Sequence, residues 1–258
     1  MPGCIKRLAG FVPGCLFIAL LLGAVEVAAR TGLVKAALVP PPSEVGRVLW
    51  VIVSTGEFAA PMLQTLTILF ISYGIACVLG IALGILMGYF QPVYCLLEPL
   101  VEILRTIPKP ILLPPLMLFL GLGNPMKIFI VTLAALFPVL INTVQAVRSV
   151  DPTLVDTART FGRGTASILW RVILPASVPM ILAGMRISLG IGLVLVVLSE
   201  MLAGTGGLGQ VIMDMQNSFK VRETFAWLVI MAVMGFALAV LFDWVERRLT
   251  FWNVPESQ

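Results

Sequence analysis

The stretch "DTARTFGRGTASILWRVILPASVP", residues 156–179, is a polar, basic and glycine-containing passage in an otherwise apolar chain. The chain is 59% hydrophobic and 12% charged, yet this stretch gathers Asp156, Arg159, Arg163 and Arg171. Charged side chains are costly inside a bilayer. We therefore expect this segment to lie outside the membrane, between two apolar runs that cross it.

Helix signals precede and divide this segment. Asp151 and Pro152 form a strong helix start, because the aspartate can cap a helix and proline suits a first turn, where no amide hydrogen is needed. A short helix is predicted from there to about Thr160. Gly162 and Gly164 then permit a turn.

A second helix is predicted after the turn, with an apolar stripe opposed by basic and polar side chains. Pro175 ends this helix and begins the next apolar run. The stripe consists of Ile168, Leu169, Val172 and Ile173. The pattern predicts an amphipathic helical hairpin at a membrane surface, and composition alone leaves open whether it simply rests on anionic lipid.

The rest of the sequence is typical of an all-α polytopic membrane protein. Its mean hydropathy of +1.05 exceeds what a soluble domain of 258 residues carries. A helix needs about 20 apolar residues to cross a bilayer, so about six spans fit, with no room for a large soluble domain. The predicted spans are 11–29, 63–89, 96–120, 127–147, 177–203 and 225–245.

An even number of spans places both termini on one side of the membrane. Basic residues are somewhat more numerous on that side, which points the termini and residues 148–176 into the cytoplasm. The chain begins like a signal sequence, but the apolar run lacks a clear cleavage site, so an uncleaved first span is expected. Prolines before Ser43 predict a short surface helix over about 43–54, capped by Ser43.

The third span carries charges and prolines together. Glu98, Glu102 and Arg105 share one helical face, so the acids can partly neutralise the arginine. Four prolines beside Lys109 break the backbone ladder, which is tolerated at membrane depth where the freed groups face protein or a water-lined path. They are Pro108, Pro110, Pro114 and Pro115. Glu102, Arg105 and Lys109 are candidates for a translocation path, and a kinked helix buried between neighbours is the alternative.

Two further charged residues lie within the fifth span. Glu200 is near its outer end, where a carboxylate must be paired or wetted. Arg186 is about 21 Å away at helical rise, so each residue needs another partner. Both are candidates for the path or for gating the external side, with a static interhelical pair as the alternative.

The second span has three glycines at four-residue spacing, Gly80, Gly84 and Gly88. They share one helical face, which lets another helix approach the backbone closely. We interpret this face as a helix-packing surface.

The sequence offers little for catalysis or for binding metals and cofactors. It has no histidine, and its four cysteines show no paired spacing. It also lacks a GxxxxGK[ST] phosphate loop, and "GGLGQ" at 206–210 is expected to form a turn and a short helix. A gradient-driven secondary transporter remains an alternative function, although such carriers show an internal repeat that is not found here.

The opening segment resembles the "EAA" loop of bacterial ABC importer permeases, whose pattern is E-A-A, three residues, G, nine residues and I-x-L-P. Here residues 156–158 are followed by three residues and a glycine, and ten residues later by "ILP" at 173–175, which agrees within one position. Aspartate replaces the glutamate and threonine the first alanine. The resemblance implies a set of ATPase-coupling residues. They are Asp156, Thr157, Ala158, Arg159, Gly162, Arg163, Ile173 and Pro175.

Nearly the whole chain resembles the nitrate/sulfonate/taurine branch of these permeases. The landmarks occur in order and include "PPPSEV", "GIALGILMG", "LEPLVEILRTIPKPILLPPL", "FLGLGNPMKIFI" and "GTGGLGQVI". The resemblance implies a type I ABC importer permease (MetI-like) fold with a cytoplasmic coupling helix. Residues 57–248 would form the transmembrane domain, after an N-terminal part, 1–56, and before a cytoplasmic tail, 249–258.

The same resemblance implies the partners. The chain would be a non-enzymatic permease of the bacterial inner membrane. It would pair with a second permease subunit, as a homodimer, and with two ATPase subunits that use ATP and magnesium. An external solute-binding protein would deliver a small solute, such as a sulfonate, taurine or nitrate. This chain itself would bind no nucleic acid, no metal ion and no cofactor.

Overall fold

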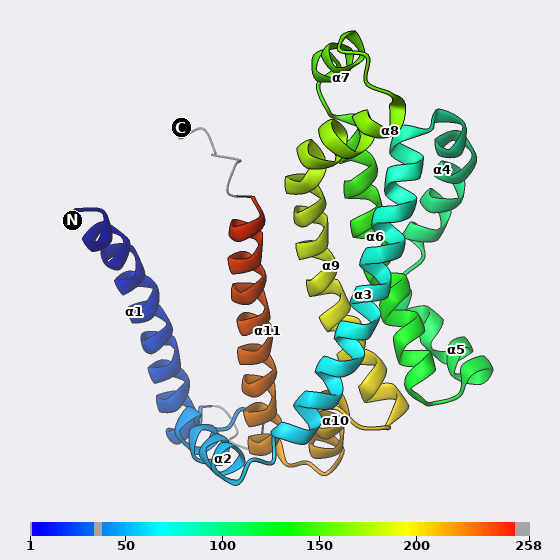
Figure 1. Cartoon of the computed structure of the whole chain (residues 1–258). Helices are drawn as coiled ribbons and strands as arrows, with labels where there is room; N and C mark the ends of the chain where they lie inside the picture. Colours follow the sequence, from blue (N-terminus) through cyan, green and yellow to red (C-terminus); the bar gives the residue numbers. More distant parts are fainter. Residues whose placement is uncertain (1, 34–37, 251–258) are drawn as a thin grey trace. The chain divides into compact units, whose positions relative to one another are not determined.

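The computed structural model describes residues 2–33 and 38–250, and every element within these ranges is a helix (Figure 1). The chain divides into two compact units. The first comprises residues 1–59 and 211–231, and the second comprises residues 60–210 and 232–258. Most of the expected tail, residues 251–258, lies outside the described residues.

The first unit contains α1 (Pro2–Arg30) and α2 (Pro42–Thr55). Glu26 of α1 accepts hydrogen bonds from the backbone amide of Ser43 at 3.0 Å and from its hydroxyl at 2.7 Å. The expected surface helix is therefore present, but the prediction that Ser43 caps it was wrong. The helix already begins at Pro42, a favourable first position, and the carboxylate of Glu26 binds the free amide instead.

In the second unit, α6 (Asn124–Arg148) packs between α3 (Ala59–Tyr89) and α9 (Leu174–Ala203). Small residues permit both contacts. A Cβ atom at Gly84 of α3 would lie 2.5 Å from Cβ of Thr143, and one at Gly184 of α9 would lie 2.5 Å from Cβ of Asn142. The Ser188 hydroxyl also donates to the carbonyl of Ala135, at 2.6 Å, which joins α9 to α6.

Within the described residues, four helical stretches are long and apolar enough to cross a membrane: α3, α6, Thr165–Ala203 and α11 (Val221–Leu249). They contain four of the predicted spans. The first predicted span, 11–29, lies in α1, where most side chains before residue 16 are outside the described set.

The third predicted span, 96–120, is not one helix. It consists of α4 (Gln91–Thr106), a short 3-10 turn and α5 (Leu113–Leu120), and the two halves are bent by 85°. The break has a simple cause: Ile107 precedes Pro108 and is extended, with ψ 122°, and the prolines that follow donate no amide hydrogen.

The expected hairpin follows α6 and consists of α7 (Pro152–Thr160) and α8 (Thr165–Ile168), which leads through a π-helical turn into α9. Asp151 caps α7 as predicted, because its carboxylate accepts from the Thr153 amide at 2.8 Å. Gly162 makes the turn with φ +71°, a conformation that glycine adopts without strain.

Candidate functional site

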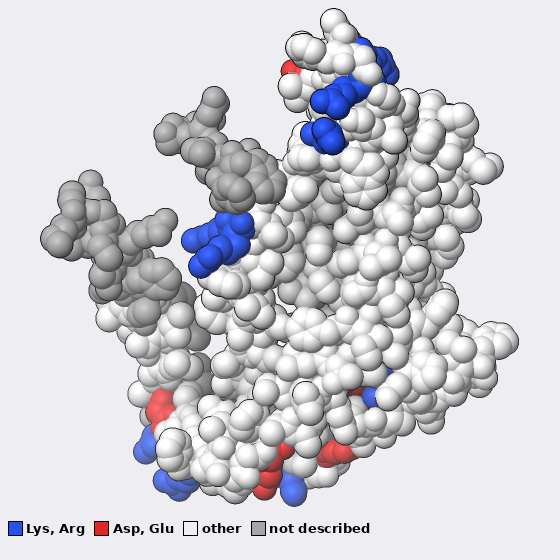
Figure 2. Space-filling view, viewed as in Figure 1, with Lys and Arg blue, Asp and Glu red and all other residues white. Residues whose placement is uncertain are grey.

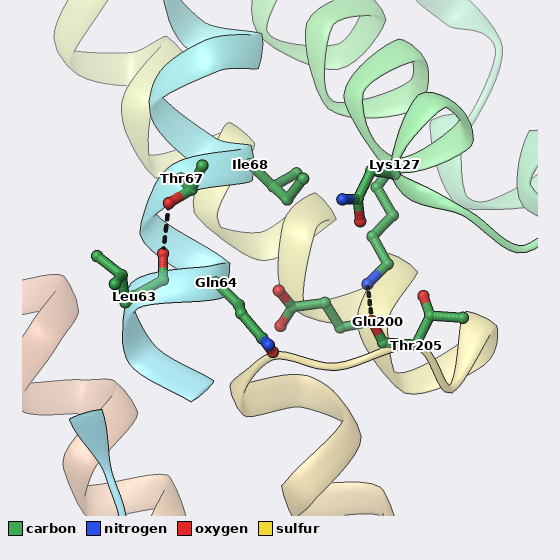
Figure 3. Close-up of a pocket in the computed structure, with 8 residues that line it drawn as sticks. Leu63, Gln64, Thr67, Ile68, Lys127, Glu200 and Thr205 are labelled. Carbon is green, nitrogen blue, oxygen red and sulfur yellow. Dashed lines mark hydrogen bonds between the residues drawn. The ribbon is translucent and has the colours of Figure 1, made fainter. Parts of the chain in front are cut away.

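A pocket lies at the end of the second unit where α3 and α6 begin and α9 ends (Figure 3). Its volume is about 260 Å³. Two charged side chains line it, together with polar and apolar neighbours from three helices and the loop after α9. The lining residues are Leu63, Gln64, Thr67, Ile68, Asn124, Lys127, Glu200 and Thr205.

Glu200 lies in the last turn of α9 and is fully buried. The Thr65 hydroxyl of α3 is 2.9 Å from both carboxylate oxygens, and the Gly209 amide donates to Oε2 at 3.0 Å. The same hydroxyl accepts from the Leu208 amide at 2.9 Å. Because these amides begin α10 (Leu208–Asn217), the carboxylate is stabilised by a helix N-terminus.

Lys127 of α6 is the second buried charge and is 1% exposed. Its Nζ atom donates to the carbonyl oxygens of Thr205 at 3.3 Å and Gly206 at 3.2 Å. Gln64 of α3 accepts from the Gly207 amide at 2.8 Å. The loop after α9 is therefore bound by three helices, with Lys127 on its carbonyl groups.

We call Gln64, Thr65, Lys127 and Glu200 the loop clamp. Glycine is required on the loop side of this clamp. Gly207 has φ +97°, and a side chain there would overlap the carboxylate of Glu200. The expected turn and short helix at 206–210 are thus present, with α10 beginning at Leu208.

Arg186 and Glu200 have separate partners, as the distance between them along α9 requires. Arg186 pairs with Asp243 of α11 at 2.6 Å and also with Glu246. Among the predicted path residues, only Glu200 lines the pocket; Glu102, Arg105, Lys109 and Arg186 do not.

The charged side chains of the broken third span mostly bind groups that are close to them in the sequence. Arg105 pairs with Glu102 at 2.7 Å on the exposed face of α4. The Lys109 ammonium donates to the carbonyl oxygens of Leu104 at 2.6 Å and Ile107 at 2.8 Å, and it also lies over the ring of Phe137. Lys109 thus closes the C-terminal end of α4, where cations and carbonyl partners are favourable.

The hairpin is anchored at its base and exposed at its tip. Ile168 and Ile173, both 4% exposed, pack against Val147 of α6, so the apolar stripe faces the spans. By contrast, α7 contains no buried residue, and Leu154 and Phe161 are 51% and 80% exposed. α7 projects beyond the ends of α6 and α9 (Figure 1).

Basic side chains gather over α7 and α8 (Figure 2). Arg159, Arg163 and Arg171 are all exposed, and Arg159 pairs with the exposed Asp156 at 3.2 Å. The tip of the hairpin therefore combines positive charge with uncovered apolar side chains.

Residues 80–251 match the family described as "Binding-protein-dependent transport system inner membrane component". The chain belongs to this permease family. It is therefore a multi-pass inner-membrane permease and not an enzyme, and ATP is hydrolysed by a separate subunit of such transporters. Family membership also makes an ATPase and a binding protein its partners, and it excludes the gradient-driven alternative.

Named relatives match three quarters or more of the permease. It is 30% identical to the "Putative aliphatic sulfonates transport permease protein SsuC" of Bacillus subtilis, over 96% of this chain and 90% of the relative. It is 31% identical to the "Taurine transport system permease protein TauC" of Escherichia coli, over 92% and 88%. It is 33% identical to the "Nitrate import permease protein NrtB" of Synechocystis, over 75% and 69%.

Solved structures agree on the fold. The permease resembles a chain of the MetNI methionine ABC transporter in an inward-facing conformation, with a TM-score of 0.63 and 23% identity. The similarity covers 73% of this chain and 94% of that chain. The expected type I importer permease fold is thereby confirmed, with the broken third span as its main local difference from the predicted helices.

Three of the four clamp residues were not predicted from the sequence. Lys127 is the first residue of the predicted span 127–147, and a lysine at the start of an apolar run is a usable signal. Thr65 and Gln64 give no signal by themselves, because polar residues of this size are common near span ends. Only Glu200 stood out.

Proposed function

We propose that this permease forms the translocation path for a small anionic solute in an ATP-driven importer. Support comes from relatives named for aliphatic sulfonates, taurine and nitrate, each at least 30% identical. In this proposal a solute-binding protein delivers the solute. Candidate residues for the path or its gates are Glu102, Arg105, Lys109, Arg186 and Glu200.

We also propose that the α7–α8 hairpin couples the path to the ATPase. The observation that carries this proposal is that α7 has no fully buried residue and leaves Leu154 and the following Phe161 exposed. Only Val155 and Ala158 of α7 pack, partly buried, against the base of the hairpin on α6. A rigid projection with an uncovered apolar tip suits docking into a groove of a partner protein. Asp156, Thr157, Ala158, Arg159, Gly162 and Arg163 would form or support that tip, with Ile173 and Pro175 at its base.

The proposal extends to the composition of the whole importer. Two copies of the permease, two ATPase subunits that hydrolyse MgATP and one binding protein would form the importer, with the termini and the hairpin in the cytoplasm. Residues 57–248 would be its transmembrane domain. Gly80, Gly84 and Gly88 would hold α3 against α6 in each copy.

Reconstitution in liposomes tests the function. Uptake of a sulfonate is expected only with the ATPase, ATP and the binding protein, and uptake by the permease alone under an ion gradient would contradict the proposal.

The coupling role is tested by Thr157→Trp on the exposed tip, which should lower transport-linked ATP turnover at least several-fold. Ser54→Trp, exposed on α2, is the matched control. A hairpin that merely rests on lipid would tolerate Thr157→Trp, because tryptophan is favourable at membrane interfaces.

A further inference from the structure

The two charged arms of the loop clamp differ in the length of their hydrogen bonds. Glu200 and Thr65 bind the start of α10 through contacts of 2.9–3.0 Å. The bonds from Lys127 to the loop carbonyls are longer, at 3.2 Å and 3.3 Å, near the long end of the range for N–H···O bonds. The Lys127 arm is therefore the weaker of the two.

Lys127 also has unused donor capacity. An ammonium group has three N–H donors, and the described residues supply two carbonyl partners, both at long distance. The side chain is 1% exposed, yet it lines the pocket, as Figure 3 shows. A buried ammonium that is only partly satisfied is costly, so an additional acceptor in the pocket would stabilise it.

The charge of Glu200 does not consume this capacity. Its carboxylate is already bound by the Thr65 hydroxyl, the Gly209 amide and the N-terminus of α10, and it makes no ion pair within 4.0 Å among the described residues. Lys127 is thus the cation of this pocket that remains available to a ligand. Gln64, Thr67 and Asn124 add polar groups at the exposed rim.

We propose that Lys127 binds the oxyanion of a small solute in this pocket, and that the anion competes with the loop carbonyls of Thr205 and Gly206. An oxyanion binds an ammonium more strongly than a neutral carbonyl does, because the attraction between two full charges adds to the hydrogen bond. The anion would therefore replace the carbonyls on Lys127 and loosen the loop, while Glu200 keeps the start of α10 in place. A pocket of about 260 Å³ suits a solute of a few heavy atoms. This inference rests on the proposed function and assigns its substrate class to one residue.

Thermal unfolding of the purified permease–ATPase complex tests the binding. The probes are ethanesulfonate, sulfate and ethylammonium at equal ionic strength. Ethanesulfonate should raise the Tm, because a ligand that binds only the folded state stabilises it, and ethylammonium should not. Lys127→Met should abolish the rise, Lys127→Arg should retain it, and Lys220→Met, which removes an exposed lysine, should leave it unchanged.

Amide hydrogen exchange in residues 204–208 tests the effect on the loop. Exchange should become faster with ethanesulfonate in the unmodified complex and stay constant in Lys127→Met. A rise in Tm with sulfate as large as that with ethanesulfonate would support recognition of the oxyanion alone, whereas a rise with ethanesulfonate only would support recognition of an organic solute.

The inference is overturned if the unmodified complex shows no rise with either oxyanion, or if the rise survives in Lys127→Met. A rise in Tm with unchanged loop exchange would overturn the competition step. If Lys127→Met does not fold, the comparison of ethanesulfonate, sulfate and ethylammonium on the unmodified complex and on Lys127→Arg still tests whether the pocket binds an anion. A complex that couples ATP turnover to uptake but fails these tests contradicts this inference alone and leaves the proposed function standing.

Discussion

Glu200 and Lys127 are buried charges that bind the main chain of one loop and do not pair with each other. An apolar bundle retains such charges only where hydrogen bonds replace the lost water. Here the Glu200 carboxylate accepts from one loop amide directly and from the Thr65 hydroxyl, which in turn accepts from a second amide. The Lys127 ammonium donates to carbonyl groups of the same segment. The two side chains together fix the loop between α9 and α10.

Thr65→Val tests how much the clamp contributes to stability. Valine has nearly the shape of threonine but leaves Glu200 and the Leu208 amide without the shared hydroxyl, so the free energy of unfolding should fall by about 1–3 kcal/mol. Thr67→Val is the matched control, because that exposed hydroxyl only donates to Leu63 of its own helix. Thermal unfolding of the purified complex measures both, and equal Tm values would show that the clamp is not stabilising.

At this scale the sequence predicted that Glu200 and Arg186 need separate partners, because their separation along one helix is fixed by its rise. It did not predict the partners themselves. Those depend on which helices lie side by side, and Asp243 and Thr65 are far from α9 in the sequence. Lys127 was missed because a lysine at a span end usually reaches water, whereas here the loop covers it.

At the scale of elements, the contact of α3 with α6 depends on glycine. A Cβ atom at Gly84 would lie 2.5 Å from Cβ of Thr143 and 3.0 Å from the carbonyl oxygen of Leu140. Neither atom is the end of a flexible side chain, so neither can easily move away. Close backbone approach of this kind provides the van der Waals contact that holds membrane helices together.

Gly84→Leu should separate α3 from α6 and lower the stability of the permease by at least about 1–3 kcal/mol, the usual cost of overpacking. Gly74→Leu is the control on the same helix, because no atom lies within 4 Å of a Cβ built there. Retention of the folded permease after heating in detergent measures the difference. If Gly84→Leu survives like Gly74→Leu, the glycine face does not carry the packing.

The cap of α7 gives a prediction for the hairpin. Hydrogen bonds from Thr153 lower the pKa of the exposed Asp151 carboxyl below its usual value of 3.8. Because the folded pKa is depressed, the cap is fully formed above pH 3.8 and is lost only as the pH falls below it. Asp151→Ala should therefore loosen α7 at neutral pH and speed amide exchange at Thr153, whereas Asp151→Asn should keep the cap. Equal exchange in the two variants would contradict this.

The ends of helices and their buried faces were the most predictable features. Asp151-Pro152, Gly162 and the apolar stripe were read correctly because capping, left-handed turns and burial of one face are local effects. The bend of 85° within 96–120 was not predicted, since prolines indicate that a helix breaks but not the direction in which the chain continues.

At the scale of the whole molecule, the fold follows from an apolar chain with one polar passage. The hairpin at 152–168 packs against the helical bundle at its base, whereas α7 contains no fully buried residue. Its exposed part therefore adds little to the packing of the bundle. Its arginines and Phe161 are exposed, and we propose that they contact a partner protein. The sequence indicated this segment, and we propose that its partner is the ATPase that the family implies.

Crosslinking of the hairpin tip to the ATPase tests the central claim most directly. In a cysteine-free background, a cysteine at the exposed Thr157 would be paired with cysteines along the proposed groove of the ATPase, with Ser54→Cys as the control position. We expect a crosslink from position 157 only, with loss of transport-linked ATP turnover that returns on reduction. Full coupling between the two subunits with no crosslink from the hairpin would contradict it.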